Sequence, residues 1–352
     1  MLQARYVFHP MIFRRPAGTS RGVLLSRQTW YLLVTDTDSP EITGIGECGL
    51  IPGLSPDDQH QVEGELKKLC STINQHQEWL SEKGQQFPAI GFALETALED
   101  LAKGGRRLFD DNDFTRGTYG IPINGLIWMG EPEYMQQQIA DKLDAGFTCI
   151  KIKIGAIDFE QELALIASIR KKFDATAIEI RLDANGAFSA DRALEYLDRL
   201  APLHIHSVEQ PIKQGQWKQM ARLCADTPVA IALDEELIGI YGDDMCQQML
   251  RMIQPHYIIL KPSLLGGLQA ADQWVSLAET LDIGWWATSA LESNIGLNAI
   301  AQWTYATAPQ VIQGLGTGQL YINNIPSPLH IEGGRLFHLP HQPWDLNALA
   351  HE

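Results

Sequence analysis

Five charged residues at the ends of short apolar runs could together remove a proton from carbon. They are Lys153, Asp183, Glu209, Asp234 and Lys261, and from Asp183 onward the spacings are 26, 25 and 27 residues. Three carboxylates that converge repel one another unless a cation lies among them, and ligands that are all oxygen favour a hard ion such as Mg²⁺. A lysine beside such an ion has a lowered pKa and can act as a general base. The predicted chemistry is removal of the proton α to a carboxylate, with the metal stabilising the resulting enediolate.

A second lysine accompanies the proposed base. Ile150 to Ile154 alternate apolar and basic residues, so the segment is predicted to be a strand with Lys151 and Lys153 on one face. Burying two ammonium groups side by side is costly unless acids face them. We expect Lys151 to lie one layer deeper, to help keep Lys153 neutral and to contact the metal-bound carboxylate.

Two further polar residues follow the predicted metal ligands. Asn185 comes two residues after Asp183 and is expected to orient that carboxylate or an ordered water, with a role in the turn as the alternative. Glu235 is adjacent to Asp234. Its side chain is predicted to point away from that of Asp234 and to support the ligands, with a place among the ligands themselves as the alternative.

Two patterns of secondary structure position these residues. Residues 1–50 show β-rich, turn-bounded runs, and residues 56–103 show helical spacing that ends in Gly104-Gly105. From residue 118, eight short apolar runs alternate with amphipathic helical stretches: YGIPINGLIW, CIKIKIG, IEIRLDANG, HSVEQPI, VAIALDEEL, YIILKPSLLGG, GWWATSALES and VIQGLGTG. This alternation predicts an α/β fold of the (β/α)8-barrel type, whose active site lies at the carboxyl ends of the strands.

The predicted division of the chain has three parts. They are an α+β domain over residues 1–117, the barrel over 118–318, and a C-terminal segment over 319–352 that returns to the first domain.

The net charge of the chain argues against some classes of binding partner. The chain has 352 residues, a formal net charge of −16 and a pI near 5.0. An acidic surface argues against nucleic acid and anionic membranes as partners, but a few local cations can still bind a small anionic substrate. The five cysteines are widely spaced without a CxxC motif, and no apolar run resembles a signal peptide or a membrane span. We therefore expect reduced thiols and a cytoplasmic location, with the oligomeric state, monomer or homo-oligomer, left open.

The motifs at the run ends resemble those of the enolase superfamily, muconate-lactonizing subgroup, over nearly the whole chain. They are Lys-x-Lys at 151–153, Asp-Ala-Asn at 183–185, Glu-Gln-Pro at 209–211, Asp-Glu at 234–235 and Lys-Pro-Ser at 261–263. The resemblance implies a modified, enolase-like barrel with an α+β capping domain. It also implies Mg²⁺, with Mn²⁺ as the alternative ion, held by Asp183, Glu209 and Asp234, with Lys153 as the base and Lys261 facing it.

Within that subgroup, TSALESNIG at 288–296 and GLGTG at 314–318 are similar to the motifs of the o-succinylbenzoate synthase family of menaquinone biosynthesis. This resemblance implies a lyase that dehydrates 2-succinyl-6-hydroxy-2,4-cyclohexadiene-1-carboxylate. Lys153 would remove the proton α to the ring carboxylate and protonate the departing hydroxyl. Lys261 would stabilise the anionic intermediate from the other face of the ring, including by cation–π contact.

The same resemblance suggests where the substrate is held. Backbone N–H groups near Gly316 and Thr317 would bind the succinyl carboxylate, because glycines allow a close backbone approach. Ser289, Leu291 and Arg21 are further predicted contacts, with Arg21 in a GTSRG turn that would act as a lid. The loop over residues 49–56 is a second candidate lid, and a plain surface loop is the alternative for both segments.

Other functions remain open at this point. Two opposed lysines suit a dipeptide epimerase or an N-acylamino acid racemase equally well, since one can deprotonate and the other reprotonate. A dipeptide epimerase is expected to carry Asp-x-Asp on its last strand, whereas GLGTG contains no acid. A catalytically inactive binding protein is a remote alternative, because all five charged residues are present.

Overall fold

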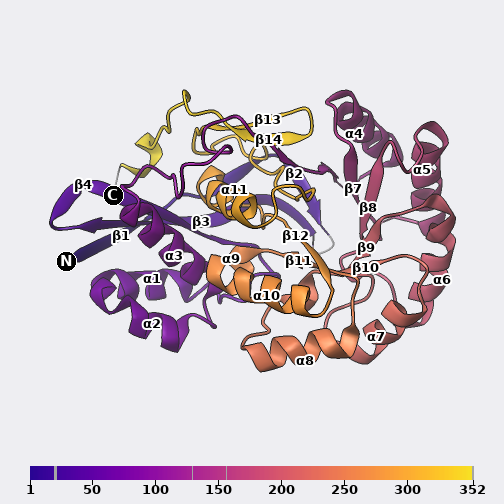
Figure 1. Cartoon of the computed structure of the whole chain (residues 1–352), viewed down its shortest axis with the longest axis horizontal. Helices are drawn as coiled ribbons and strands as arrows, with labels where there is room; N and C mark the ends of the chain where they lie inside the picture. Colours follow the sequence, from indigo (N-terminus) through magenta and orange to yellow (C-terminus); the bar gives the residue numbers. More distant parts are fainter. Residues whose placement is uncertain (20–21, 129, 156, 351–352) are drawn as a thin grey trace.

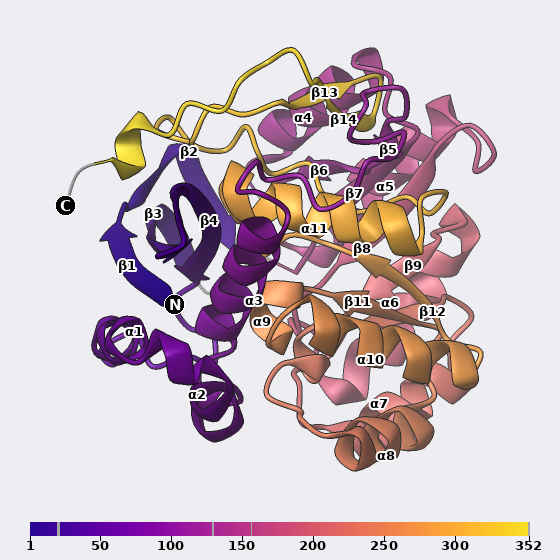
Figure 2. The same cartoon turned by 60° about the vertical axis from the view of Figure 1, so that its left-hand side comes forward.

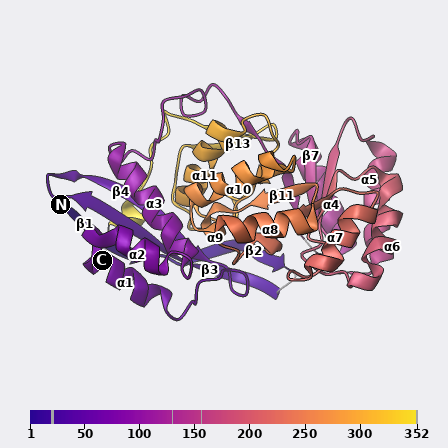
Figure 3. The same ribbon diagram turned by 60° about the horizontal axis from the view of Figure 1, so that its bottom comes forward.

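An antiparallel sheet and three helices form the N-terminal part of the chain in the computed structural model, which describes residues 1–19, 22–128, 130–155 and 157–350. The sheet joins β1 (Leu2–Phe8), β2 (Met11–Thr19), β3 (Gly22–Asp36) and β4 (Ser39–Leu50), with β3 pairing all three others. Figure 3 shows the β2–β3 hairpin extending from this sheet toward the rest of the molecule. The helices that follow are α1 (Val62–Ser71), α2 (His76–Lys83) and α3 (Pro88–Ala102).

Residues 29–34 of β3 are buried on both faces because different elements cover each one. Leu32 and Val34 pack in a core with residues of α1 and α3, whereas Tyr31 and Leu33 point to the opposite face. Successive side chains of a strand alternate between faces, which explains this division. The predicted β-rich start of the chain is confirmed.

Seven parallel strands form the second part, in the order in which they occur along the chain. They are β6 (Gly125–Ile127), β7 (Cys149–Lys153), β8 (Glu179–Asp183), β9 (Ser207–Glu209), β10 (Ile231–Leu233), β11 (Tyr257–Leu260) and β12 (Gly284–Ala287). Helices cover the outer face of this curled sheet, as Figure 1 shows. They are α4 (Pro132–Asp144), α5 (Phe159–Lys172), α6 (Ala190–Leu200), α7 (Trp217–Asp226), α8 (Asp243–Ile253), α10 (Leu268–Thr280) and α11 (Asn294–Thr307). The predicted α/β barrel of enolase type is confirmed.

The eighth predicted run, VIQGLGTG, is not a strand of this sheet, so that part of the prediction is wrong. It forms isolated parallel bridges instead, from Gln313 to Ile123 and from Gly314 to Thr288. Glycines weaken a strand because they offer no side chain to pack. The run nevertheless lies between the first and last strand positions and connects them.

The two parts meet along α3 and the short helix α9 (Pro262–Leu265) (Figure 2). A Cβ atom at Gly91 would lie 3.0 Å from the carbonyl oxygen of Gly266, so a side chain there would push the two segments apart. Glu95 of α3 accepts hydrogen bonds from the backbone N–H groups of Leu268 (2.6 Å) and Gln269 (2.9 Å), at the start of α10. The N-terminal part thereby supports the segment that follows Lys261.

The C-terminal segment contacts both parts. Strands β13 (Leu329–Glu332) and β14 (Arg335–His338) form a small sheet with β5 (Ile121–Pro122), and Leu349 packs in a core with Tyr31. Four 3₁₀ turns complete the elements: Ile73–Gln75, Ala201–Leu203, Glu235–Leu237 and Asn347–Leu349. Within the described ranges, no helix is long and apolar enough to cross a membrane. All five cysteines are free thiols.

Candidate active site

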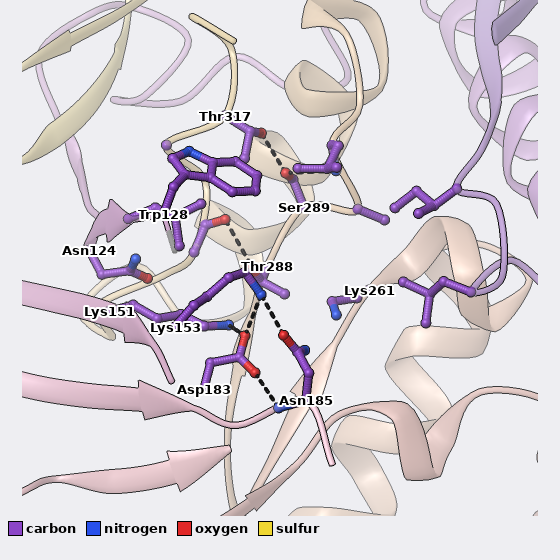
Figure 4. Close-up of a pocket in the computed structure, with 17 residues that line it drawn as sticks. Asn124, Trp128, Lys151, Lys153, Asp183, Asn185, Lys261, Thr288, Ser289 and Thr317 are labelled. Atoms are coloured by element: carbon purple, nitrogen blue, oxygen red, sulfur yellow. Dashed lines mark hydrogen bonds and ion pairs between the residues drawn. The ribbon is translucent and has the colours of Figure 1, made fainter. Parts of the chain in front are cut away.

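Parallel pairing places the charged strand ends side by side. Lys153 is in register with Asp183 on the neighbouring strand, and Asp183 is in register with Glu209 on the next. Lys153 Nζ lies 2.9 Å from Asp183 Oδ2, and Figure 4 shows both groups at the floor of one pocket. Lys261 bonds to Asp234 and points toward Lys153 from the opposite wall. The structure therefore brings together all five charged residues that the spacing singled out.

Lys151 lies beneath this pair and connects two of the acids. Its Nζ is 2.5 Å from Glu209 Oε2 and 3.0 Å from Asp183 Oδ2. Burial opposes the charged form of Lys151, but the charges of Asp183 and Glu209 outweigh it and raise its pKa. Lys151 is thus an internal cation of the cluster, in the deeper layer that its place on the strand predicted.

Asn185 links Lys153 to a fourth acid. Its Oδ1 accepts a hydrogen bond from Lys153 Nζ (2.8 Å), and its Nδ2 donates to Glu235 Oε1 (2.9 Å). The prediction that the Glu235 side chain points away from that of Asp234 is wrong, because both carboxylates act on the ammonium group of Lys261. Glu235 begins a 3₁₀ turn instead of continuing β10, so the strict alternation of a strand does not apply to it.

The cluster contains more acid than base. Asp183, Glu209, Asp234 and Glu235 face the ammonium groups of Lys151, Lys153 and Lys261. Burial and the charge of Asp183 raise the pKa of Glu209. Glu209 Oε1 and Asp234 Oδ1 are buried without a hydrogen-bond partner among the described residues. Two open carboxylate oxygens beside an excess of acid fit a hard divalent cation.

The side chains are not arranged around an ion in this structure. Among the residues that the structure describes, no three His, Cys, Asp or Glu side chains group as a metal site. Lys151 lies between Asp183 and Glu209, and Lys261 bonds to Asp234. The fit to a metal therefore rests on the donor atoms and their open positions.

The upper wall of the pocket comes from the run ends on the other side of the sheet. Ser289, Leu291, Gly316 and Thr317, all predicted substrate contacts, line the pocket, and Ser289 Oγ is 2.5 Å from Thr317 Oγ1. Ile51 of the predicted lid over residues 49–56 also lines it. Arg21 lies outside the described residues.

Leu291 is held in an unusual backbone conformation. Its φ of 62° lies in the left-handed region, which is costly for a residue with a branched side chain. The Tyr321 hydroxyl donates to the Leu291 carbonyl oxygen (2.6 Å), and the Leu291 N–H donates to Ser289 Oγ (3.3 Å). Contacts from the C-terminal segment thus fix one wall of the pocket.

A buried carboxylate of the N-terminal sheet anchors the same loop. Glu47 pairs with Arg27 (2.7 Å) and accepts bonds from the Ser293 N–H (2.8 Å), the Ser293 hydroxyl (2.5 Å) and the Gly296 N–H (2.9 Å). Both Glu47 oxygens are therefore saturated. The position of the loop after β12 depends on the N-terminal sheet.

Sequence reasoning missed five residues that line the pocket. Asn124, Leu126 and Trp128 belong to the first predicted run, YGIPINGLIW, and Thr288 and Ala290 belong to the seventh. Trp128 is the last residue of the first run, so the expectation that site residues lie at the carboxyl ends of the strands would have found it. It stands above Lys153 in Figure 4. Asn124 gave no signal of its own, because its type is also common in turns.

Comparison with known proteins places the chain among enzymes of one fold. A family model described as enolase C-terminal domain-like matches residues 134–343. The o-succinylbenzoate synthase of Desulfotalea psychrophila is 50% identical over 95% of this chain and 98% of its own length.

Solved structures agree with this relationship. The crystal structure of MenC from Desulfotalea psychrophila superposes with a TM-score of 0.85 at 46% identity, covering 96% of this chain and 99% of that one. A dipeptide epimerase from Enterococcus faecalis, complexed with Mg and a dipeptide, superposes with a TM-score of 0.81 at 20% identity over 97% of each chain. The second likeness shows the shared fold alone.

Proposed function

The chain belongs to the enolase C-terminal domain-like family, and from that premise we propose that its pocket carries out the o-succinylbenzoate synthase reaction. The substrate is 2-succinyl-6-hydroxy-2,4-cyclohexadiene-1-carboxylate, a small dianion, and the product is o-succinylbenzoate. The activity rests on 50% identity over nearly the full length of both chains. The geometric observation that supports it is the pair of opposed lysines, each bonded to a different acid of one cluster.

Asp183, Glu209 and Asp234 would hold Mg²⁺, with Mn²⁺ as a substitute. When bound, the ion would supply positive charge to the ring carboxylate and favour loss of the α-proton. Lys151 neutralises part of the acid cluster, and Asn185 and Glu235 orient Lys153 and its partner Asp183.

Lys153 takes the α-proton and returns a proton to the departing hydroxyl, so that water leaves and the ring becomes aromatic. Lys261 stays charged on the opposite face, because Asp234 and Glu235 outweigh the effect of its burial and raise its pKa. An ammonium group in that position stabilises the negative charge that develops on the ring.

We assign the succinyl carboxylate to the wall formed by Ser289, Gly316 and Thr317. Hydroxyl groups and glycine backbone are the donors available there. Leu291 covers the apolar side of the ring. The role of Arg21 stays a prediction.

A racemase of N-acylamino acids is the second candidate, since opposed lysines also suit proton exchange between two faces. Dipeptide epimerisation is disfavoured, because residues 314–318 contain no acid to hold a substrate amino group.

The decisive experiment is a spectrophotometric assay of the purified protein on the cyclohexadiene carboxylate, first with Mg²⁺ and then with EDTA. Fast aromatisation that EDTA abolishes is the expected result. Lack of turnover by a protein that binds Mg²⁺ would contradict the proposal. Polarimetry with N-acylamino acids and dipeptides would then test the racemase.

A further inference from the structure

We propose that Asn124 binds the hydroxyl group that leaves the substrate, and so distinguishes the substrate from the aromatic product. This inference rests on the proposed function. It assigns a role to a pocket residue that is neither a proposed metal ligand nor one of the two opposed lysines.

The first observation is an unsatisfied buried acceptor. Asn124 is 4% exposed, and its Oδ1 has no hydrogen-bond partner among the described residues. Among the side chains that line the pocket, Asn124 alone has such an atom within the part of the chain that the structure describes. Leaving a buried acceptor unpaired is unfavourable, so a ligand that donates to it relieves part of that penalty on binding.

The second observation is the rigid placement of this residue. The Asn124 N–H donates to the Gln313 carbonyl oxygen (2.9 Å), and the next residues form β6, which pairs with β7. Figure 4 shows the Asn124 amide beneath Trp128, on the wall that carries Lys151 and Lys153 and away from Lys261. The amide therefore faces the side of the pocket from which the base acts.

The chemistry of the substrate identifies the group that fits. Its two carboxylates and its ketone only accept hydrogen bonds, whereas the 6-hydroxyl is its one donor. An unpaired acceptor on the Lys153 wall thus matches the hydroxyl and no other group of the substrate. Because Lys153 both removes the α-proton and protonates the hydroxyl, the hydroxyl must lie on the same side as the base.

This contact would orient the step in which water leaves. By accepting the hydroxyl hydrogen, Asn124 turns the oxygen lone pairs toward the Lys153 ammonium group. The C–O bond then breaks with its electron pair on oxygen, Lys153 returns the proton it took, and water departs while the electrons of the broken α-C–H bond complete the aromatic ring. Atoms and charge balance without any further reactant.

The contact would also disfavour the product. o-Succinylbenzoate has no hydroxyl, so Asn124 Oδ1 is again unpaired in the product complex. Sites built around a hydrogen-bonding hydroxyl discriminate against ligands that lack it. Asn124 would therefore weaken product binding relative to substrate binding.

The test compares wild type with Asn124→Ala and Asn124→Ser in the Mg²⁺-loaded protein. For Asn124→Ala we expect kcat/KM to fall by about 10- to 100-fold while the product inhibition constant changes less than about threefold. In D₂O, unreacted substrate should acquire deuterium at the α-carbon, since a misoriented hydroxyl lets the intermediate regain a proton before water leaves. Asn124→Ser keeps an acceptor and should recover part of the rate.

Asn298→Ala is the matched control, because Asn298 is also buried with an unpaired Oδ1 but lies on α11 outside the pocket lining. It should leave kcat/KM and deuterium exchange unchanged. Equal losses of substrate and product affinity in folded Asn124→Ala, or no deuterium exchange, would overturn the inference. If Asn124→Ala fails to fold, the same comparison with Asn124→Ser decides. If wild type itself does not aromatise the substrate, it is the proposed function that fails.

Discussion

Two buried acid clusters of this molecule differ in how completely their oxygens are bonded. At the interface between the N-terminal sheet and the loop after β12, both oxygens of Glu47 are saturated by Arg27 and by donors of Ser293 and Gly296. At the ends of β9 and β10, Glu209 Oε1 and Asp234 Oδ1 have no partner within the described residues.

The difference separates an acid whose oxygens are satisfied within the protein from acids that we propose to bind an ion. Burying a carboxylate is expensive unless its lone pairs are satisfied, and Glu47 meets that requirement within the protein. The cluster at the strand ends leaves oxygens open, which fits the cation proposed for it. The predictions below test this distinction.

The largest effect is expected at the base. Lys153→Ala should lower kcat by about 10⁴-fold while circular dichroism stays unchanged, because it removes the proposed base and leaves on that wall Lys151, whose ammonium group is held between Asp183 and Glu209. Lys142→Ala is the control, since Lys142 is half-buried above the Phe147 ring (4.9 Å) and away from the pocket. Residual turnover within tenfold of wild type would remove Lys153 from its role.

Breaking the saturated cluster should reduce stability. Glu47→Ala leaves Arg27 buried and unpaired, so urea denaturation should show a loss of about 3–5 kcal/mol in the free energy of unfolding. Glu195→Ala removes a solvent-exposed partner of Arg192 and should leave the urea midpoint nearly unchanged, because solvent screens such pairs. Similar losses in the two variants would mean that Glu47 is not the structural anchor described here.

Changing the open cluster should act on metal binding instead. Asp234→Asn is expected to weaken Mg²⁺ affinity by about 10- to 100-fold in calorimetry, because it removes a charged ligand. Glu236→Gln is the matched control: Glu236 is also buried, but its oxygens accept from Gln210 and from the Gly215 N–H. An unchanged affinity in Asp234→Asn would exclude Asp234 from the ligand set.

The smallest effect, a change in the pH dependence of stability, is expected at Asp57, a buried acid that is only partly hydrogen-bonded. Asp57 accepts from the Ala89 N–H (3.1 Å), and burial raises its pKa to about 7. The folded state then holds a proton that the unfolded state has lost, so this group's contribution to stability falls as pH rises from about 4 to 7.

Asp57→Asn mimics the protonated acid and should match wild type near pH 4. At pH 8 it should exceed wild type by about 1–2 kcal/mol in the free energy of unfolding, because the amide avoids burying a charge. The gain stays this small because the new N–H₂ group needs a partner in the same buried place. Chemical denaturation at both pH values measures this. A variant less stable than wild type at pH 8 would show that the charged form is the stabilising one.

The sequence alone determined much of this protein. Apolar runs that alternate with helical stretches predicted parallel strands, and the 26- and 25-residue spacings of the acids predicted that they meet at one end of the sheet. This works because strand direction and period are local properties that repeat at every strand. Lys151 and Lys153 on one face followed from the same period.

Only the tertiary structure decided the remaining features. Glu235 faces the cluster because a 3₁₀ turn replaces strand alternation there, and VIQGLGTG makes bridges in place of a strand. The Glu47 oxygens are saturated by partners up to 249 residues away along the chain. Whether the Asn124 oxygen finds a partner is likewise decided by residues that are distant in sequence. Hydrogen-bond satisfaction is a property of the packed molecule, and residue type and local spacing carry no information about it.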